Sequence, residues 1–486
     1  MEVLQRTANR GSIATGAAYD IDNSLKFEAD NSEYLKANNT FASTTPTSRK
    51  KGTVSFWIKR TEIGNGVSGK QMYIFASSDS SRYSNLGFDE FDNLTVFSGD
   101  SSWNSVSPYT YNKFRDTSAW YHIVIRYDTT DSTASNRLRV YSNGTEVSWV
   151  TAPNITQDGV MTYSGMNGPC WHSWGTIYSY FTPAKFFSGY LAEAHFVDGQ
   201  SLAPTEFGET DSDSGIWKPK EYDGTYGNCG YYLDFADSGN LGDYESGNGF
   251  DFDLNNIAAA DQATDTPTNN FCIGNALINF APGGQTLVRG GTKFSNPSGQ
   301  NWQTITGTFG LTSGKWYWEF ESDGTGAFVG ISDVQDSIIP QNTGGYFLGY
   351  GDDNSSTTKS LGMYSANGVI YNDSGSATGG SYGSGNRVGV ALDMDNRKIY
   401  FAVDNTWVNS GDPANGTNGA TWNTSWSDTV FPAGSCAQNN SIFFVYGGFS
   451  SLSNISNVDA NGYGGFYYTP PSGYYALCSR NLSEFG

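Results

Sequence analysis

Hydrophobic and polar side chains alternate in short runs along most of the chain. Between residues 53 and 58 the alternation places Val54, Phe56 and Ile58 on one face, and 121–127 repeats the pattern. Because successive side chains of a strand point to opposite faces, each run predicts a half-buried β-strand. Long patterns with the helical period of 3.6 residues are missing. The sequence therefore predicts an all-β chain.

Turn residues predict how some of these strands pair. Asn143-Gly144 separates the alternating run 137–141 from 145–149, and this dipeptide suits the two positive-φ positions of a type I′ turn. Further along, Asp395-Asn396 separates two more alternating runs. Both places predict antiparallel hairpins.

The alternating runs fall into two blocks, at 20–210 and 286–468. The residues between them, 211–285, are rich in Asp, Gly and Asn, with isolated aromatic patches. So long a stretch without regular structure indicates a domain boundary. We therefore expect two β-sandwich domains in tandem joined by an irregular connector, with an N-terminal arm at 1–19 and a C-terminal tail at 469–486.

The connector carries aromatic residues without evident local partners. Tyr231, Tyr232 and Phe235 are the clearest example. We expect another surface to cover them, from a second copy of the chain or from a different protein.

Composition narrows the set of partners. The chain has 486 residues with 48 Asp and Glu against 27 Lys and Arg, a formal net charge of −21. Such a charge repels the phosphate backbone of nucleic acids, so we expect no nucleic-acid partner. The same charge also keeps a protein soluble without any specific role.

Cysteines and the N-terminal sequence bear on the compartment. The five cysteines show no Cys-x-x-Cys spacing, which disfavours a disulfide scaffold or a zinc site. Residues 1–6 lack the basic and apolar start of a secretory signal, and no run of eighteen apolar residues occurs. We expect synthesis in a cytoplasm without a signal peptide and no insertion into membranes.

Catalytic motifs are sparse. The three histidines, His122, His172 and His195, are not accompanied by a Gly-x-Ser-x-Gly elbow, and the Gly-Gly pairs lack the Lys-Ser or Lys-Thr of a phosphate loop. We assign no catalytic residue. Calcium is the one cofactor left open, because carboxylates gather in the connector, although without EF-hand spacing: Asp234, Asp237, Asp243, Asp251 and Asp253.

Loop aromatics are the candidates for ligand binding, because flat rings suit the CH groups of sugars. Trp171 and Trp174 lie in one aromatic loop, and Trp103 stands beside Asn104 in another. Burial in the core is the rival explanation for each tryptophan.

Residues 20–210 resemble a concanavalin-type or laminin-G-like jelly roll. The resemblance rests on four patches in order, at 54–58, 120–124, 138–144 and 189–193. Some members are glycoside hydrolases with a Glu-x-Asp-x-x-Glu strand, but Glu193 here is followed two residues later by His195 instead of Asp. The resemblance therefore implies binding without hydrolysis.

Residues 286–468 resemble a SPRY domain. The matching patches are Ser313–Glu319, Val329–Ile331, Arg387–Asp393 and Lys398–Asn405. SPRY domains meet ligands through loops at one rim, which implies the segments 333–341, 346–353 and 407–412 here. Asp333, Tyr346 and Trp407 are the candidate residues, by analogy alone.

The two domains in tandem resemble structural proteins of tailed bacteriophages. This implies a virion protein, tail fibre or capsid-associated, that attaches to host-surface glycan or protein, contacts other virion proteins and forms a homo-oligomer, a trimer in fibres of this kind. Two alternatives stay open: a purely structural virion subunit, and an enzyme that degrades surface polysaccharide.

Overall fold

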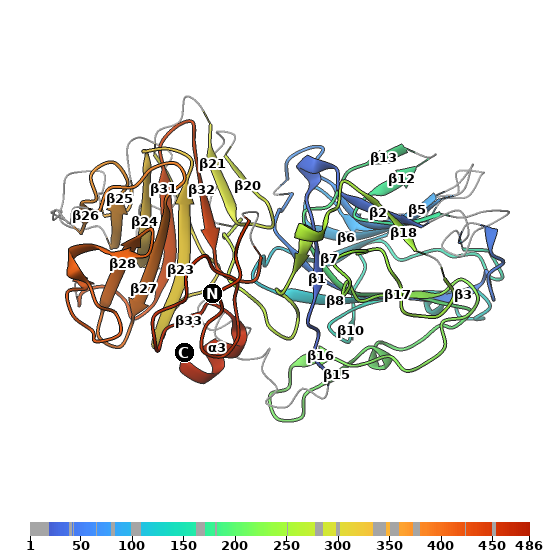
Figure 1. Cartoon of the computed structure of the whole chain (residues 1–486). Coiled ribbons are helices and arrows are strands. Elements are labelled where there is room, and N and C mark those ends of the chain that lie inside the picture. The colour runs from blue at the N-terminus through green and yellow to red at the C-terminus, as the bar shows by residue number, and fades with distance from the viewer. Residues whose placement is uncertain are drawn as a thin grey trace. The chain divides into compact units, whose positions relative to one another are not determined.

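The computed structural model describes residues 19–37, 41, 43–64, 66–78, 83–98, 108–161, 171–179, 182–249, 251–277, 285–297, 302–333, 347–349, 359–372, 380–422, 424–449 and 453–486. Strands dominate these residues, and α3 (Ser479–Phe485) is the one α-helix among the elements assigned to them. The prediction of an all-β chain is confirmed. The chain divides into two units between residues 268 and 269, each with its own sheets (Figure 1).

The first unit is a sandwich of two antiparallel sheets. Sheet 1 contains, in spatial order, β10 (Thr145–Glu146), β9 (Leu138–Ser142), β8 (Trp120–Asp128), β3 (Lys51–Arg60), β14 (Gly189–Asp198), β1 (Ser24–Phe27) and β19 (Gln262–Ala263), with β17 (Tyr231–Leu233) also paired to β14. Sheet 2 contains β18 (Phe252–Asn255), β2 (Tyr34–Ala37), β11 (Trp171–Trp174), β4 (Met72–Ser78), β5 (Tyr83–Phe88), β6 (Asn93–Ser98) and β7 (Tyr109–Lys113). Two hairpins flank them, β12 (Ile177–Ser179) with β13 (Thr182–Ala184) and β15 (Gly208–Thr210) with β16 (Trp217–Pro219).

The core of this unit lies between the facing sides of the two sheets. Val54, Phe56 and Ile58 of β3 are fully buried in it, as the alternation predicts. The Asn143-Gly144 turn is also confirmed, because both residues have positive φ, 47° and 75°, and join β9 to β10. The returning strand is shorter than predicted.

The prediction of an irregular connector at 211–285 is wrong. Tyr231–Leu233 pairs with β14, Phe252–Asn255 extends sheet 2 beside β2, and Gln262–Ala263 pairs with β1. These strands are short and separated by turns, so their two-residue alternation is too brief to detect in the sequence. Residues up to 268 complete the first sandwich.

The aromatic residues of this stretch are covered by their own unit. Tyr231 and Phe235 are fully buried in its core, and Tyr232 is half-buried. These residues therefore need no second chain to cover them, and trimer formation is supported by the resemblance alone.

The second unit is another two-sheet sandwich. Sheet 3 contains β20 (Thr286–Val288), β21 (Lys293–Asn296), β32 (Asn440–Val445), β23 (Lys315–Ser322), β27 (Arg387–Asp393), β28 (Lys398–Val403) and β29 (Thr406–Trp407), with β30 (Ala420–Thr421) on β28 and β33 (Tyr475–Ala476) on β23. Sheet 4 contains β22 (Gln303–Thr306), β31 (Val430–Cys436), β24 (Ala327–Asp333), β25 (Ser360–Tyr364) and β26 (Ile370–Tyr371).

The boundaries predicted for the second domain, 286 and 468, are too narrow. Phe271 forms a β-bridge with Cys478, and β33 adds a parallel pairing to β23. Cys272 and Cys478 are both buried, so the segments on either side of the predicted domain help to build its core. The residues predicted as a C-terminal tail are structural parts of the sandwich.

Candidate functional site

A row of aromatic side chains lies on the outer face of sheet 2. Leu86, Leu94 and Val96 point into the core with at most 1% of their surface exposed, so the alternate positions on β5 and β6 point outward. On β7, Thr110 is buried and its two neighbours are exposed. We call the outward-facing aromatic residues of four strands and of β11 the aromatic strip: Tyr73, Tyr83, Phe97, Tyr109, Tyr111 and Trp171.

Strand register places these rings side by side. Tyr73 pairs with Gly87, Gly87 with Thr95, and Thr95 with Tyr109, so one rung crosses four strands. Gly87 is required there, because a Cβ at this position would come within 2.7 Å of the Tyr73 ring. With strands about 4.8 Å apart, the strip spans about 19 Å from β11 to β7.

The rings of the strip remain partly accessible. Tyr111 is 65% exposed and Tyr109 37% exposed, while Tyr83 and Phe97 are half-buried and stack on each other at a centroid distance of 4.9 Å. Planar polar groups stand near Tyr73, where the amide of Gln71 donates a hydrogen bond to Glu90 (2.7 Å). Burial, and then the nearby Tyr83, Glu90 and Asp89, raise the pKa of Tyr73. Flat uncharged rings beside planar polar groups can hold a sugar face and its hydroxyls.

The structure separates the two tryptophans of the predicted aromatic loop. Trp171 pairs with Ser78, which pairs with Tyr83, so Trp171 faces outward with the strip. Trp174, three residues later, points to the opposite face, where its indole is fully buried and donates a hydrogen bond to the Tyr231 hydroxyl (3.1 Å). Trp174 is thus a core residue and offers no face to a ligand, and its prediction as a binding residue is corrected.

Sequence reasoning missed most of the strip. Trp103 and Asn104 fall outside the described residues, as does Tyr346. The usable signal was the alternation Tyr109-Thr110-Tyr111, which puts two tyrosines on one face of a strand.

The outer face of sheet 1 is covered by the chain itself. We call the covering segment, residues 202–226, the strap. Phe207, Tyr222 and Tyr226 of the strap pack over Val124 and Val197 of the sheet. The strap therefore buries the polar side chains that point outward from the central strands.

His122 lies beneath the strap between two indole rings. Trp57 stacks on it at 4.8 Å and Trp217 at 5.9 Å, each inclined by 19°. The Trp217 indole N–H donates to Nδ1 of His122 (2.9 Å), so the ring proton is on Nε2 and is donated to Ser55 Oγ (2.9 Å). Burial lowers the pKa of His122 to about 3, with a smaller effect of His195. A histidine that donates to the serine cannot accept its proton, so this pair is not an activated nucleophile.

Glu193 lies at a bulge in β14, where the register with β3 shifts between Ala192 and His195. Its φ is 52°, a conformation rare for residues other than glycine. The hydroxyls of Tyr19 and Tyr232 donate to its two carboxylate oxygens (2.7 and 2.6 Å). Burial, and next the Glu193 charge, raise the pKa of both tyrosines well above the usual range.

His195 completes this cluster under the strap. Its ring stacks on Tyr232 at 4.4 Å, with Nδ1 2.9 Å from the Tyr226 hydroxyl and Nε2 3.6 Å from Glu193. Such a bulged and hydrogen-bonded arrangement fixes the strap to the sheet. Strained residues also occur at active sites, so this cluster is where chemistry would be sought.

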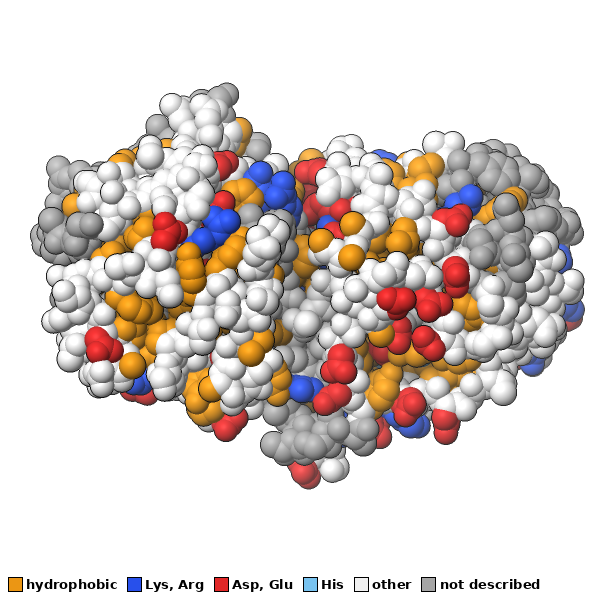
Figure 2. Space-filling model, in the orientation of Figure 1, with side chains coloured by type: hydrophobic (Ala, Val, Ile, Leu, Met, Phe, Trp, Pro, Cys, Tyr) orange, Lys and Arg blue, Asp and Glu red, His pale blue; other side chains and the backbone are white. Residues whose placement is uncertain are grey.

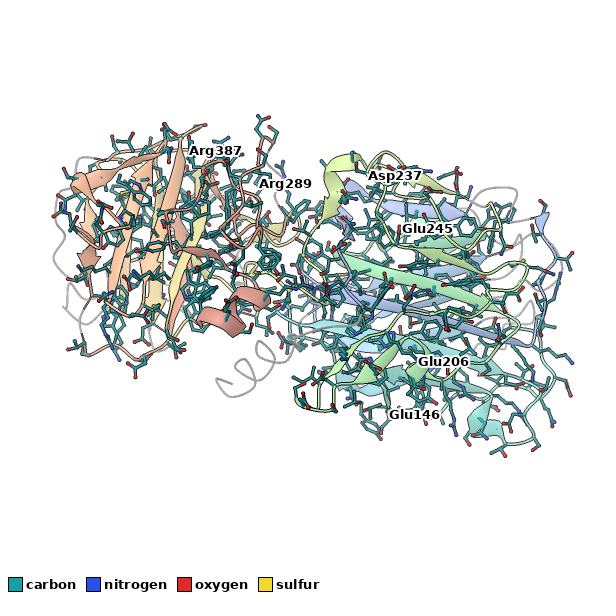
Figure 3. All side chains as sticks on the ribbon, turned by 60° about the horizontal axis from the view of Figure 1, so that its bottom comes forward. Glu146, Glu206, Asp237, Glu245, Arg289 and Arg387 are labelled. Carbon is teal, nitrogen blue, oxygen red and sulfur yellow. The ribbon has the colours of Figure 1, made fainter. Side chains whose placement is uncertain are left out.

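Of the carboxylates considered for calcium, Asp234 lies near Glu193 of this cluster. Figure 2 shows acidic side chains gathered on the face of the first unit toward the viewer, and Asp237 and Glu245 are labelled in Figure 3. Burial, with Glu193 and Asp243 nearby, raises the pKa of Asp234, and Asp234 raises that of Glu245. Asp253 is exposed on β18, and burial and Asp243 raise the pKa of Asp251. In the described part of the chain, no three His, Cys, Asp or Glu side chains are grouped to hold a metal ion. Calcium stays a prediction.

In the second unit, the structure describes two of the predicted site residues. Asp333, at the end of β24, is fully buried and accepts hydrogen bonds from the backbone N–H and the hydroxyl of Ser427, so its prediction as a ligand contact is corrected. Trp407 is half-buried, and its ring is nearly perpendicular to that of Tyr400 at a centroid distance of 6.5 Å. Its role in binding stays a prediction.

The outer face of sheet 3 is covered by the chain's last residues. Glu319 of β23 is fully buried there and accepts the backbone N–H groups of Tyr467 and Tyr468 (2.7 and 2.8 Å) and the Tyr317 hydroxyl (2.9 Å). Burial raises the pKa of Glu319 to about 7, although these donors and Arg387 act in the opposite direction. Arg387, labelled in Figure 3, forms an ion pair with Glu321 on the same face.

Two family models match the chain. The model described as the concanavalin A-like lectin/glucanases superfamily matches residues 29–202, and the SPRY domain model matches residues 315–449. The domain composition inferred from the sequence is thereby confirmed. No curated protein matches.

Solved structures resemble parts of the chain at low identity. A SAP-like pentraxin from Limulus polyphemus is 17% identical (TM-score 0.28; 38% of this chain, 80% of that chain), and the SPRY domain of human HERC1 is 16% identical (0.26; 33% and 91%). A putative carbohydrate binding protein from Bacteroides ovatus is 14% identical (0.33; 49% and 59%). Within the described residues, no helix has the length and apolar character to cross a membrane.

Proposed function

We propose that this chain is a non-enzymatic recognition protein that binds carbohydrate through the aromatic strip of its first sandwich. The observation that carries the proposal is the exposure of Tyr109 and Tyr111 on the outer face of sheet 2. Tyr83 and Phe97, on the paired strands β5 and β6, lie on the same face. Large exposed apolar groups gathered on one face indicate an interaction site. The concanavalin A-like match supports carbohydrate as the ligand class.

The charge of the chain favours an uncharged glycan. A net charge of −21 repels acidic polysaccharides at long range. The outward side chains of β5 and β6 are likewise uncharged: Tyr83, Asn85, Asn93, Thr95 and Phe97. Ring stacking, with hydrogen bonds from neighbouring polar groups, then supplies the affinity.

The biological setting comes from the sequence resemblance. As a structural protein of a tailed phage, tail fibre or capsid-associated, the chain would present this strip to glycan on the host surface. The absence of catalysis is part of the proposal, and it is supported by the proton arrangement at His122, which leaves Ser55 without a base.

Affinity electrophoresis tests the proposal. The full chain should be retarded in gels that contain neutral polysaccharides and not in gels with acidic ones, and Tyr111→Ala should be retarded less than the wild-type chain at the same glycan concentration. Lys113→Ala is the matched control at the end of the same strand, and we expect it to keep the retardation.

Incubation with the retained glycan should release no reducing ends. Retardation that survives Tyr109→Ala with Tyr111→Ala, or sugar release that Glu193→Gln abolishes, would refute the proposal.

A further inference from the structure

Two lysines are buried on the outer face of sheet 1. Lys26 of β1 and Lys59 of β3 both pair in register with Tyr190 of β14, so the three residues form one rung. Their side chains are 4% and 0% exposed. Each ammonium meets an aspartate from the segment that closes the unit, Asp261 at 2.7 Å from Lys26 and Asp265 at 2.6 Å from Lys59.

The two pairs differ in their surroundings. Lys26 also contacts Glu33, whose carboxylate oxygens lie 3.0 and 2.8 Å from Nζ. Glu33 is 2% exposed, and Asn31 donates a hydrogen bond to it (2.9 Å). Each aspartate also accepts one N–H donor that stabilises its charged form, Asp261 from the backbone of Ala258 (2.8 Å) and Asp265 from the indole of Trp120 (3.0 Å). Lys26, Asp261 and Glu33 thus form a triad of one amine and two carboxyl groups.

Burial favours a triad without net charge. One ammonium between two carboxylates leaves an excess negative charge, which is costly away from water. Burial, and to a smaller extent Asp261, raise the pKa of Glu33, while Lys26 opposes this. A protonated Glu33 can donate its proton to an oxygen of Asp261 and can then accept a proton from Nζ of Lys26. A general acid and base must do both.

We propose that Lys26 and Asp261 are joined by an intramolecular amide bond that the folded chain forms by itself, with Glu33 transferring the protons. Lys26 first passes a proton to Asp261, giving a free amine and a carboxylic acid. The Nζ lone pair attacks Cγ of Asp261 while Glu33 protonates the carbonyl oxygen, and Glu33 then removes a proton from the nitrogen.

Glu33 next protonates one hydroxyl of the tetrahedral carbon, which leaves as water when its C–O bond breaks. Glu33 recovers its proton from the other hydroxyl. A C–N bond has formed, one water has left, and Glu33 is unchanged. No oxidant or co-reactant takes part.

The geometry and the energetics favour this step. Nζ of Lys26 already touches an oxygen bonded to the carbon it attacks, so a small rotation of the carboxyl group brings nitrogen and carbon to about 3–3.5 Å. The product replaces a buried ammonium and a buried carboxylate with a neutral amide, which removes their desolvation cost. The cross-link would join β1 to the 3-10 turn Ala259–Asp261 and hold the two ends of the first unit together.

The mass of the denatured full chain tests the proposal. We expect the wild-type chain to weigh one water less than its sequence, and Glu33→Gln and Lys26→Arg to have the full mass of theirs. Near-ultraviolet circular dichroism shows whether each variant is folded. Lys59→Arg is the matched control from the second pair, and its mass should still lack one water. A wild-type chain of full sequence mass overturns the proposal.

Peptide mapping locates the bond and does not depend on how the variants fold. Digestion of the wild-type chain should give one branched peptide that contains residues 26 and 261, with no cleavage after Lys26 by trypsin. A missing water that maps to Lys59 and Asp265, or to an Asp-Gly step, refutes the assignment. So does a Glu33→Gln chain that still lacks the water.

Discussion

The two outer faces of the first sandwich differ in what covers them. On sheet 1 the strap buries His122, Glu193 and His195, and their polar atoms are engaged with tyrosines, Trp217 and Ser55. On sheet 2 uncharged rings remain at the surface, with Tyr111 the most exposed. The histidines and the glutamate considered for catalysis thus hold a cover in place, whereas the proposed recognition surface consists of rings that carry no charge.

The second unit repeats the covered arrangement. Glu319 of sheet 3 holds the backbone of Tyr467 and Tyr468, as Glu193 holds the hydroxyls of Tyr19 and Tyr232. In both units a buried glutamate on a central strand binds a segment distant in sequence. The comparison predicts that substitutions under a cover change stability and that substitutions on the strip change binding.

Removing a buried carboxylate from the outer face of sheet 1 should have the largest effect. Asp265→Ala deprives the fully buried Lys59 of its carboxylate, which should lower the free energy of unfolding of the first unit by about 3–5 kcal/mol. Denaturant unfolding followed by tryptophan fluorescence measures the loss. Asp158→Ala, which breaks the exposed pair with Lys50, is the control and should cost less than about 1 kcal/mol. Equal losses for the two variants would contradict the covered arrangement.

A change of pH should destabilise the second unit by a smaller amount. The pKa of Glu319 is about 7 in the folded chain against an ordinary value of 4.5, so the folded state binds the proton more tightly. The resulting stability is complete below pH 4.5 and is lost as the pH rises through 7, by about 1–3 kcal/mol. Unfolding midpoints between pH 4 and 8 measure it, and Glu319→Gln should flatten the profile. Stability that rises with pH over this range would show that the hydrogen bonds to Glu319 lower its pKa by more than burial raises it.

Substitution on the strip should lower affinity with little effect on folding. Tyr109→Ala and Tyr111→Ala each remove a partly exposed ring, so we expect each to weaken glycan binding by about 1 kcal/mol, roughly fivefold. Their unfolding free energies should stay within about 0.5 kcal/mol of wild type. Isothermal titration with the glycan retained in the gel assay measures the first effect. A strip variant that loses glycan affinity and folding stability together would contradict the assignment of binding to sheet 2 and of stability to the covered face of sheet 1.

Much of the fold follows from two-residue alternation, and the misses have a physical cause. The strands around Val54–Ile58 and at residues 121–127 are long enough to show the alternation and are found where predicted. The strands β17, β18 and β19 have two to four residues, and their pairing partners lie far away in the sequence. Their place is decided by tertiary pairing, which local patterns do not encode.

The candidate site was harder to predict. Trp171 and Trp174 are the same residue type at the two ends of one short strand, and only the exact position of β11 decides which of them faces outward. Tyr83 and Phe97 belong to separate strands, and register alone stacks them. The covers over His122 and Glu319 were likewise hidden, because they depend on segments nearly 100 and 150 residues away: Trp217, Tyr467 and Tyr468.

Hydrogen exchange with and without glycan tests the central claim most directly. If the strip is the binding face, the backbone amides of β5, β6 and β7 should gain protection on binding a neutral glycan, while the strap at 202–226 and the strands of the second unit should not change. Tyr111→Ala should reduce the gain at a glycan concentration that half-saturates the wild-type chain. Protection confined to the strap or to the second unit, with β6 and β7 unchanged, would contradict the account.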